Sequence, residues 1–363
     1  MENDIEFFTG VPDSLLQNIT AFLTDHAPEG RHLTAANEGN AIALAVGHYL
    51  ATGKIGLVYM QNSGLGNVVN PLLSLADPEV YSVPVLLLIG WRGEPGIKDE
   101  PQHLKQGLVT LPLLETLGIK YTRLSPTDDD ASNAVTLAAE QMRSGNAPYA
   151  LIASKNIFGP YRGSTHQNNP YSISREKALR VVLSGLDPSG PVVSTTGKLS
   201  REIYEYRKAE NQGHQGDFLN VGSMGHASQI ALGIALRKPD RKVYCLDGDG
   251  AVLMHMGALA IIGNSGATNF RHIVFNNGAH DSVGGQPTQG FNIDLPAVAK
   301  ACGYRQTGRA ESKAEILKHL RAFQDCKGPY LLEIRVRRGS RADLGRPQES
   351  PRENKAEFMK FLK

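Results

Sequence analysis

Cysteines, long apolar runs and a surplus of charge are scarce in this chain of 363 residues, and each scarcity excludes a class of protein. The three cysteines, Cys245, Cys302 and Cys326, have no CxxC spacing, which argues against a disulfide framework and against a zinc site. No apolar run approaches the roughly 18 residues of a membrane-spanning helix. The formal net charge of +2 lacks the basic field that nucleic-acid-binding proteins carry.

The remaining composition, 41% hydrophobic and 20% charged, is that of a globular protein, and the length fits two domains of common size. The chain starts with acidic and polar residues, Met1 to Asp4, which are not typical of a secretory signal. We therefore expect a cytoplasmic protein that binds neither membrane nor nucleic acid.

Short apolar runs alternate with helical patterns in both halves, which predicts an α/β fold with parallel sheets covered on both faces. Strands are expected at residues 55–59, 83–89, 149–152, 192–194, 243–246, 272–275 and 330–334. Residues 156–174 are rich in turn-forming Gly, Pro and Asn and are interpreted as a linker, with Ser174 capping the next helix. This interpretation gives domains at 1–155 and 175–340, followed by a C-terminal tail at 341–363.

The most informative pattern is Asp-Gly-Asp-Gly at 247–250, followed 25 residues later by the pair Asn276-Asn277. The sequence between them, 251–263, predicts a packed helix, so the whole segment is typical of a strand–helix–strand unit. Such a unit places Asp249 and Asn277 at the same edge of one parallel sheet. A carboxylate, an amide oxygen and loop carbonyls suit Mg²⁺, which usually keeps phosphate oxygens in its coordination shell. Taken singly, either motif is most often a turn.

Gly-Asp-Gly followed at this distance by Asn-Asn is the signature of thiamine-diphosphate enzymes, and the chain resembles that family. The resemblance implies two flavodoxin-like, doubly wound parallel-sheet domains, one for the pyrimidine ring and one for the diphosphate. The chain has no room for the middle domain of larger members. The resemblance also implies that Asp249, the side chain of Asn277 and the carbonyl of Ala279 hold Mg²⁺.

Further residues are assigned to thiamine diphosphate by the same resemblance. Met224 is the expected wedge that bends the cofactor, and the Gly222 carbonyl is the expected acceptor for its amino group; the alternative for Met224 is a gap-filling core residue. Diphosphate contacts are expected from the strand end at 194–198 and from the start of the next helix, specifically from Thr196, Gly197, Gly248, Gly250 and Ala251. Ala251 stands where many members of the family have Ser.

Glu38 opens a helix of small residues, and the resemblance implies that it protonates the far ring nitrogen of the cofactor. In this family the glutamate reaches the cofactor of a partner subunit, which implies at least a homodimer. Without the resemblance, Glu38 would be interpreted as an acidic residue favoured by the helix dipole.

The substrate is indicated by loops at 8–15, 61–67, 90–103 and 339–347, which resemble the phosphonopyruvate decarboxylase branch of the family. This implies that an anionic 2-keto acid, 3-phosphonopyruvate, loses CO₂ to give phosphonoacetaldehyde; sulfopyruvate or another 2-keto acid is the alternative. A phosphonate calls for basic donors, and Arg92 and Arg341 are the leading candidates because each lies in a Gly-flanked loop.

Asp13 and His103 are expected to move protons during turnover. Larger decarboxylases carry a Glu where this chain has Val283, and His280, Asp281 and Ser282 are the candidates to replace it. His255, between two methionines, is expected to be packed within a helix.

Two other classes of protein are alternatives to a thiamine-diphosphate-dependent decarboxylase. A nucleotide-binding oxidoreductase needs a GxGxxG turn, and Gly64-Leu65-Gly66 lacks the third glycine. A non-catalytic thiamine-binding subunit need not retain both Glu38 and the metal residues.

Overall fold

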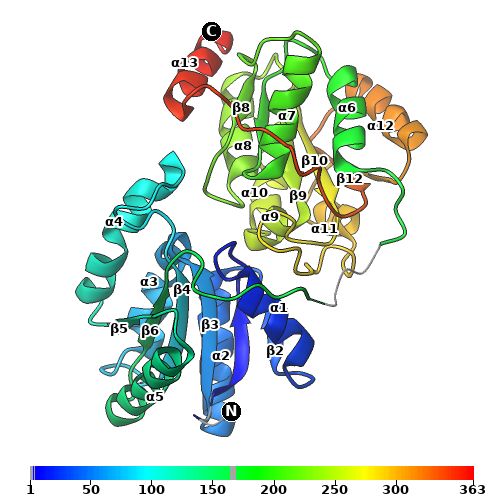
Figure 1. Cartoon of the computed structure of the whole chain (residues 1–363). Helices are drawn as coiled ribbons and strands as arrows, with labels where there is room; N and C mark the ends of the chain where they lie inside the picture. Colours follow the sequence, from blue (N-terminus) through cyan, green and yellow to red (C-terminus); the bar gives the residue numbers. More distant parts are fainter. Residues whose placement is uncertain (1–2, 4, 164–168) are drawn as a thin grey trace. The chain divides into compact units, whose positions relative to one another are not determined.

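The computed structural model describes residue 3, residues 5–163 and residues 169–363. The chain divides into two compact units, residues 1–166 (unit 1) and 167–363 (unit 2), which Figure 1 shows in blue to green and in green to red. Each unit is described by itself.

Unit 1 is built on a six-stranded sheet with the order β2-β1-β3-β4-β6-β5, in which every pairing is parallel. Its strands are β1 (Ile5–Gly10), β2 (His32–Thr34), β3 (Ile55–Gln61), β4 (Val85–Gly90), β5 (Lys120–Arg123) and β6 (Tyr149–Ala153). Its helices are α1 (Gln17–His26), α2 (Glu38–Thr52), η1 (Asn62–Gly64), α3 (Leu65–Pro71), η2 (Leu72–Ala76), α4 (Pro101–Thr116) and α5 (Asp128–Gly145).

The core of unit 1 lies on both faces of this sheet because successive strand residues point to opposite sides. Val58 and Met60 of β3 belong to the cluster formed with α2 and α3, whereas Tyr59 belongs to the cluster formed with α5. Both faces are therefore covered, as the near-continuous apolar strands predicted.

Unit 2 repeats this arrangement with the order β11-β12-β10-β9-β7-β8, again parallel throughout. Its strands are β7 (Val192–Ser194), β8 (Asp217–Leu219), β9 (Val243–Gly248), β10 (Phe270–Asn276), β11 (Gln306–Ala310) and β12 (Tyr330–Arg335). Its helices are α6 (Arg175–Gly185), α7 (Lys198–Ala209), α8 (Ala227–Arg237), α9 (Asp249–Met254), α10 (Ala258–Asn264), α11 (Leu295–Ala301), α12 (Lys313–Asp325) and α13 (Pro351–Phe361).

The two units have the same topology. Numbered within each unit, both sheets read 2-1-3-4-6-5, so the direction of winding reverses between the first and third strands. Open α/β sheets bind ligands at this reversal, beyond the carboxyl ends of the strands. The shared order therefore predicts one binding edge in each unit: between β1 and β3, and between β7 and β9.

Helix caps explain where several elements begin. Ser174 accepts a hydrogen bond from the backbone of Lys177 and starts α6, as expected. Asn37 caps α2 by accepting from the backbone of Asn40, which fixes Glu38 in the first helical turn.

The prediction of one continuous helix over 251–263 is wrong. Helix α9 ends at Met254, because His255 leaves helical geometry (φ −133°, ψ 49°), and α10 begins only at Ala258. The His255 ring packs on the backbone of Gly225, where an added Cβ would lie 2.5 Å from the ring. Packing against this loop replaces continuation of the helix.

The last segment of the chain, expected as a tail, contains α13. Phe358 packs against Phe218 of β8, and Asn354 accepts from the backbone of Leu219 and donates to that of Asp217. The helix thus covers the edge strand of unit 2.

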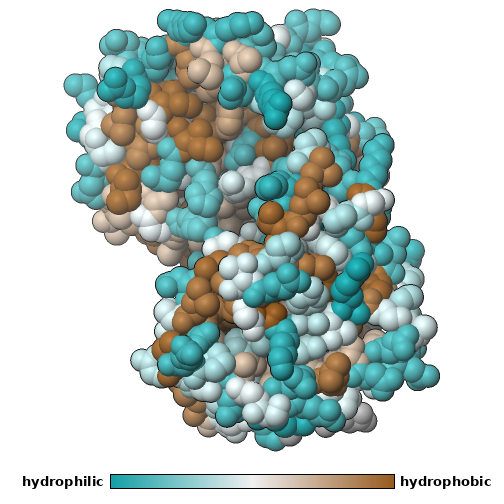
Figure 2. All heavy atoms as spheres, turned by 90° about the vertical axis from the view of Figure 1, so that its left-hand side faces the viewer, coloured by the Kyte–Doolittle hydropathy of each residue, from teal (hydrophilic) through white to brown (hydrophobic). Residues whose placement is uncertain are grey.

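Hydrophobic side chains also reach the surface, as Figure 2 shows in brown among hydrophilic residues. On α4, at the left of unit 1 in Figure 1, Leu104 and Leu108 are exposed. None of the helices in the described parts of the chain has the length and hydropathy to cross a membrane.

Candidate active site

The two sequence motifs of unit 2 meet at the carboxyl edge of its sheet. β9 and β10 are neighbouring parallel strands in which Gly248 pairs with Phe275. Asp249 begins α9 immediately after β9, and Asn277 directly follows β10. The expectation that Asp249 and Asn277 share one sheet edge is confirmed.

Asp249 is a buried carboxylate at the start of α9. Its side chain is 2% exposed, and burial raises its pKa to about 6, against hydrogen bonds from the Thr288 hydroxyl and the backbone of Asn277. Among the residues that the structure describes, no lysine, arginine or histidine forms an ion pair with it. Because a buried anion without a cation is costly, these residues fit a divalent metal ion.

The loop after Asn277 encloses this carboxylate. The Asn277 side-chain oxygen accepts from the backbone of Ala279 at 3.1 Å, and Ala279 is buried beside it. At Gly290 an added Cβ would lie 2.5 Å from Asp249 Oδ2. The loop after β10 thus contacts the Asp249 carboxylate and carries an amide oxygen, and this donor set suits Mg²⁺.

The strand end expected to contact the diphosphate lies at the winding reversal beside β9. Thr196 and Gly197 follow β7, and Gly197 has a φ of +96° that favours glycine. An added Cβ at Gly197 would lie 2.9 Å from the hydroxyl of Ser282, in the loop that follows Asn277. The two predicted cofactor segments are thus in contact.

The Gly248–Ala251 turn is bordered by two side chains from other loops. An added Cβ at Gly250 would lie 3.3 Å from Met224 Cε and 3.0 Å from the His280 ring. The expected wedge residue is therefore next to the metal motif. Burial lowers the pKa of His280 to about 4, which leaves its ring neutral near pH 7.

The remaining residues expected to bind the cofactor are Gly222, Ala251 and Gly248. The Gly222 backbone N–H donates to the Asn220 side chain at 3.3 Å, which holds the loop that carries Met224. Ala251 is buried in the first turn of α9. Gly248 has open space where a Cβ would point.

Glu38 lies at the binding edge of unit 1. It is 5% exposed and accepts a hydrogen bond of 2.7 Å from the Asn67 amide. Gly64 packs on the Glu38 carboxylate, because a Cβ added at Gly64 would lie 2.6 Å from Glu38 Oε1. The glutamate is thus fixed between the starts of α2 and α3.

Asp13 lies in the loop after β1, at the winding reversal of unit 1. It is fully buried, and burial raises its pKa to about 6, opposed by the Leu15 backbone N–H and the charge of Arg92. Oδ2 accepts from Leu15 at 2.9 Å, whereas Oδ1 has no hydrogen-bond partner among the described residues. A buried carboxyl with a free oxygen and a raised pKa suits proton transfer.

Arg92 lies in the neighbouring loop after β4, and His103 lies in the first turn of α4, which follows that loop. Arg92 makes a two-pronged ion pair with Asp99, at 2.8 and 2.6 Å, and donates to the Ser14 hydroxyl at 2.9 Å. Burial, together with the charge of Arg92, lowers the pKa of His103 to about 4. The structure therefore brings Asp13, Arg92 and His103 together at one sheet edge.

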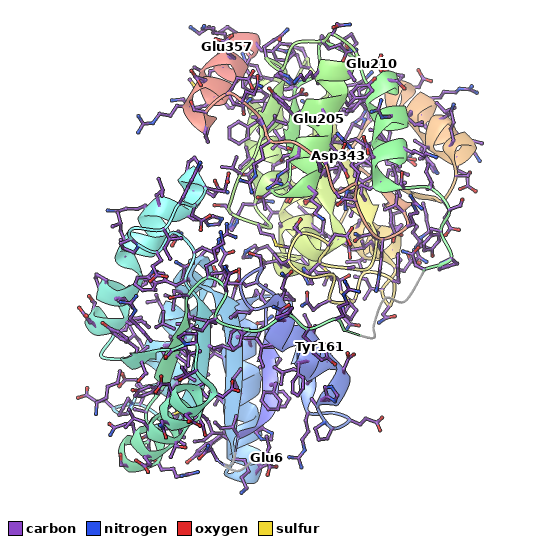
Figure 3. The ribbon with its side chains drawn as sticks, viewed as in Figure 1. Glu6, Tyr161, Glu205, Glu210, Asp343 and Glu357 are labelled. Atoms are coloured by element: carbon purple, nitrogen blue, oxygen red, sulfur yellow. The ribbon has the colours of Figure 1, made fainter. Side chains whose placement is uncertain are left out.

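Arg341 has different surroundings. Its guanidinium faces three carboxylates, Glu205 at 2.9 Å, Asp343 at 3.1 Å and Glu176 at 3.4 Å. Figure 3 labels Glu205 and Asp343 near α7. Three carboxylates around one guanidinium exceed its positive charge, whereas Arg92 has an ion pair with Asp99 alone among the described residues. Arg341 therefore gains no support as a phosphonate-binding residue, and that assignment stays a prediction.

Some residues of the site carry no distinctive sequence pattern. The Asn62 amide donates to the Arg92 carbonyl at 2.8 Å and to the Thr110 hydroxyl at 2.9 Å, and so joins the loops after β3 and β4. Asn62 lies in the amide-rich stretch at 61–67. Nothing in the sequence distinguishes Thr288, which bonds to Asp249.

A second polar cluster lies inside the sheet beneath the motif. The side chains of Cys245, Asp247 and His272 approach within 4.8 Å of one another and are buried. The His272 ring is 3.4 Å from Asp247 and 3.1 Å from the Tyr304 hydroxyl, so both of its nitrogens have partners. We interpret the cluster as a core network that links β9 to β10.

Comparisons with known proteins agree with this geometry. The thiamine pyrophosphate enzyme N-terminal TPP binding domain matches residues 1–111, and the C-terminal TPP binding domain matches residues 195–334. Two sheets of the same topology, matched in this order and without a middle domain, define the class as the thiamine pyrophosphate enzymes.

Relatives that match nearly the whole chain identify the branch of thiamine pyrophosphate enzymes to which it is similar. The chain is 37% identical to phosphonopyruvate decarboxylase of Streptomyces viridochromogenes, covering 97% of this chain and 90% of the relative. It is 36% identical to that of Streptomyces hygroscopicus (97% and 89%) and 27% identical to sulfopyruvate decarboxylase of Methanosarcina acetivorans (99% and 95%). The chain belongs to the phosphonopyruvate decarboxylase family of thiamine pyrophosphate enzymes, and it is therefore a carboxy-lyase rather than an oxidoreductase.

Proposed function

We propose that the chain catalyses the Mg²⁺-dependent, non-oxidative decarboxylation of 3-phosphonopyruvate to phosphonoacetaldehyde and CO₂, as a step in phosphonate biosynthesis. The observation that supports this substrate is sequence identity over nearly the full length of the chain. The identity is 37% and 36% to two phosphonopyruvate decarboxylases, compared with 27% to a sulfopyruvate decarboxylase. Sulfopyruvate is the second candidate because that relative also spans the whole chain.

The residues of unit 2 support the cofactor half of this proposal. Asp249, the Asn277 side chain and the Ala279 carbonyl would hold Mg²⁺, and the buried, uncompensated carboxylate of Asp249 supports that role. Thr196, Gly197 and the backbone of the Gly248–Ala251 turn would bind the diphosphate. Thiamine diphosphate, when bound, supplies the electron sink that decarboxylation requires.

Glu38, Gly222 and Met224 would prepare the cofactor. The Glu38 carboxyl would share a proton with the pyrimidine ring, the Gly222 carbonyl would accept from the amino group of that ring, and Met224 would pack against the cofactor. The buried position of Glu38, held by Asn67 and Gly64, supports a fixed proton contact.

The loop cluster of unit 1 would serve the substrate. Arg92 presents a planar guanidinium that the Asp99 ion pair holds in place, and such a group suits a phosphonate. Asp13 would hold a proton at its unpaired oxygen, and the neutral His103 ring can accept or donate one. The carbon that loses CO₂ needs one proton, and these two groups are the candidates to supply it.

The assembly that we propose is a homodimer, or a larger assembly of dimers, in which Glu38 of one subunit serves the cofactor bound by its partner. The support is membership of the thiamine pyrophosphate enzyme family. The cytoplasmic location stays an expectation from the composition.

Product analysis tests the proposal. The purified chain, freed of metal with EDTA and supplied with 3-phosphonopyruvate, should release CO₂ and give the phosphorus resonance of phosphonoacetaldehyde only after both thiamine diphosphate and Mg²⁺ are added. Turnover without either addition, or no phosphonoacetaldehyde with both present, would contradict it.

A further inference from the structure

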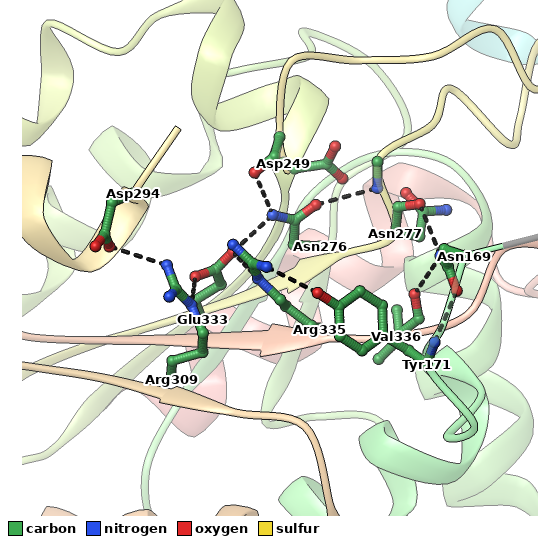
Figure 4. A network of polar contacts seen from close by, with 12 residues as sticks. Asn169, Tyr171, Asp249, Asn276, Asn277, Asp294, Arg309, Glu333, Arg335 and Val336 are labelled. Carbon is green, nitrogen blue, oxygen red and sulfur yellow. Dashed lines mark hydrogen bonds and ion pairs between the residues drawn. The ribbon is translucent and has the colours of Figure 1, made fainter. Parts of the chain in front are cut away.

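Both asparagines of the motif pair donate their side-chain amides to carboxylates, of which Glu333 is buried and Asp281 is partly buried. Asn276 Nδ2 donates to Glu333 Oε1 at 2.7 Å, and Asn277 Nδ2 donates to Asp281 Oδ2 at 2.6 Å. Figure 4 shows the first of these contacts at the centre of a polar network beneath the metal motif. Glu333 lies on β12, and Asp281 lies in the loop that follows Asn277 itself.

The two carboxylates decide which way each amide faces. An ionised carboxylate only accepts hydrogen bonds, so the NH₂ group of the asparagine must point toward it and the oxygen must point away. The Asn276 oxygen accordingly accepts from the Gly278 backbone at 3.0 Å, and the Asn277 oxygen accepts from Ala279 at 3.1 Å. Both oxygens are thereby turned into the loop that carries the metal donors.

Arginines keep both carboxylates available as acceptors. Glu333 is fully buried and accepts from Arg309 Nε at 2.6 Å and Arg335 Nε at 3.2 Å. Asp281 accepts from Arg175 Nη1 at 3.2 Å, and Arg175 is itself held by two hydrogen bonds to Glu202, at 2.8 and 2.9 Å. These guanidinium groups supply the opposite charges that carboxylates inside the fold require.

The network also fixes the two ends of the loop at residues 278–290, which packs on Asp249. Asn276 Nδ2 donates a second hydrogen bond to the Gly290 carbonyl at 2.7 Å, while its oxygen holds Gly278. Gly290 is the residue that packs directly on Asp249. The orientation of one amide thus sets the position of the backbone at Gly278 and at Gly290.

We propose that Asp281 and Glu333 are positioning residues that orient the asparagine pair and so set the affinity for the divalent cation. The inference rests on the proposed function, because it concerns the same metal site. It gives Asp281 a role other than proton transfer: the carboxylate already accepts from Asn277, Arg175 and the backbone of Gly339.

The test measures metal binding rather than turnover. Mn²⁺ replaces Mg²⁺ as the probe, and free Mn²⁺ is counted by electron paramagnetic resonance while the full-length protein is titrated with saturating thiamine diphosphate present. Asp281→Asn and Glu333→Gln keep the shape but allow the amides to turn, and each should weaken Mn²⁺ binding by roughly 10- to 100-fold, the usual effect of losing an outer-shell partner. Asp294→Asn, which removes an exposed partner of the same Arg309, should bind like the unaltered protein.

A rescue variant separates orientation from general stability. In Asn277→Asp combined with Asp281→Asn, either oxygen of the new carboxylate can face the metal, and the total charge is unchanged. Mn²⁺ affinity should return to within several-fold of the unaltered protein. Single variants with normal Mn²⁺ affinity, or a double variant that binds as weakly as Asp281→Asn, would overturn the inference. Failure of the unaltered protein to bind Mn²⁺ would instead overturn the proposed function.

Discussion

At the scale of single residues, the buried carboxylates differ in what compensates them. Glu333 and Asp281 are paired with arginines, which indicates a structural use. Among the residues that the structure describes, Asp249 has no ion-pair partner and Asp13 Oδ1 has no hydrogen-bond partner. Asp249 thus lacks a positive partner that a metal ion could supply, and Asp13 has an oxygen that a proton could occupy. We therefore assign function to these two carboxyl groups.

Glu38 provides the first prediction at this scale. Glu38→Gln keeps the hydrogen-bonded shape but removes the transferable proton, so the variant should bind thiamine diphosphate normally and lose roughly 10²- to 10⁴-fold in kcat. Cofactor binding by calorimetry and kcat under saturating substrate check this. Glu140→Gln, on the exposed side of α5, is the control, and near-normal turnover of Glu38→Gln would remove Glu38 from its role.

Asp13 predicts a dependence of stability on pH. Its folded pKa of about 6 lies above its ordinary value of 3.8, so the folded chain holds a proton that the unfolded chain releases between these values. This contribution to stability is complete below the ordinary pKa and is lost as the pH rises through about 6. It amounts to a change on the order of 3 kcal/mol, at about 1.4 kcal/mol for each pKa unit.

Asp13→Asn removes this titration. Relative to the unaltered protein, the variant should gain thermal stability as the pH is raised from about 4 to about 7. Melting curves at several pH values measure the difference, with Asp128→Asn, exposed at the start of α5, as the control. A difference in Tm that stays constant across this range would show that Asp13 does not titrate there.

At the scale of elements, the sequence predicted β3, β4, β6, β7, β9, β10 and β12 and missed β1, β2, β5, β8 and β11. Each of the predicted strands contains a run of apolar residues, and its bounds were predicted within a few residues. Strands such as β5, Lys-Tyr-Thr-Arg, are short and polar because they lie at a sheet edge. The break at His255 could not be predicted because it depends on packing against Gly225, which is distant in sequence.

The loop between Asn277 and Gly290 gives a prediction for this scale. In Gly290→Ala the new methyl group would lie 2.5 Å from Asp249 Oδ2 and 2.6 Å from the Asn276 oxygen, so the loop must move away from the metal position. Metal-dependent binding of thiamine diphosphate should weaken at least about tenfold, by the same loss of positioning.

Gly233→Ala is the matched control for this substitution. Gly233 lies within α8 with nothing within 4 Å of its Cβ position, so alanine there should leave cofactor binding unchanged. Unchanged binding in Gly290→Ala as well would show that the loop does not shape the cation site.

At the scale of the whole molecule, two units of one topology each present loops at a winding reversal. The sequence predicted the metal motif and Glu38 because their spacing and context are specific. It could not predict that Asp281 and Glu333 contact the asparagine pair and arginines from other elements. It also could not predict the three carboxylates around Arg341. Such contacts become visible only when the chain is folded.

The proposed shared sites predict complementation between inactive subunits. Glu38→Gln and Asp249→Asn each lack one half of a site, but a mixed dimer would contain one intact site if Glu38 serves the partner. Random re-association of equal amounts should therefore restore about a quarter of the unaltered activity. Activity that stays at the level of the separate variants after subunit exchange, checked by native mass spectrometry, would contradict shared sites.

The central claim, a metal- and thiamine-diphosphate-dependent decarboxylase acting on 3-phosphonopyruvate, is tested most directly by a substrate comparison. CO₂ release is measured side by side from 3-phosphonopyruvate, sulfopyruvate and pyruvate with thiamine diphosphate and Mg²⁺ present. We predict that kcat/KM for 3-phosphonopyruvate exceeds both others by at least about 100-fold, corresponding to about 2.7 kcal/mol of transition-state discrimination. A higher kcat/KM for sulfopyruvate or pyruvate would contradict the account.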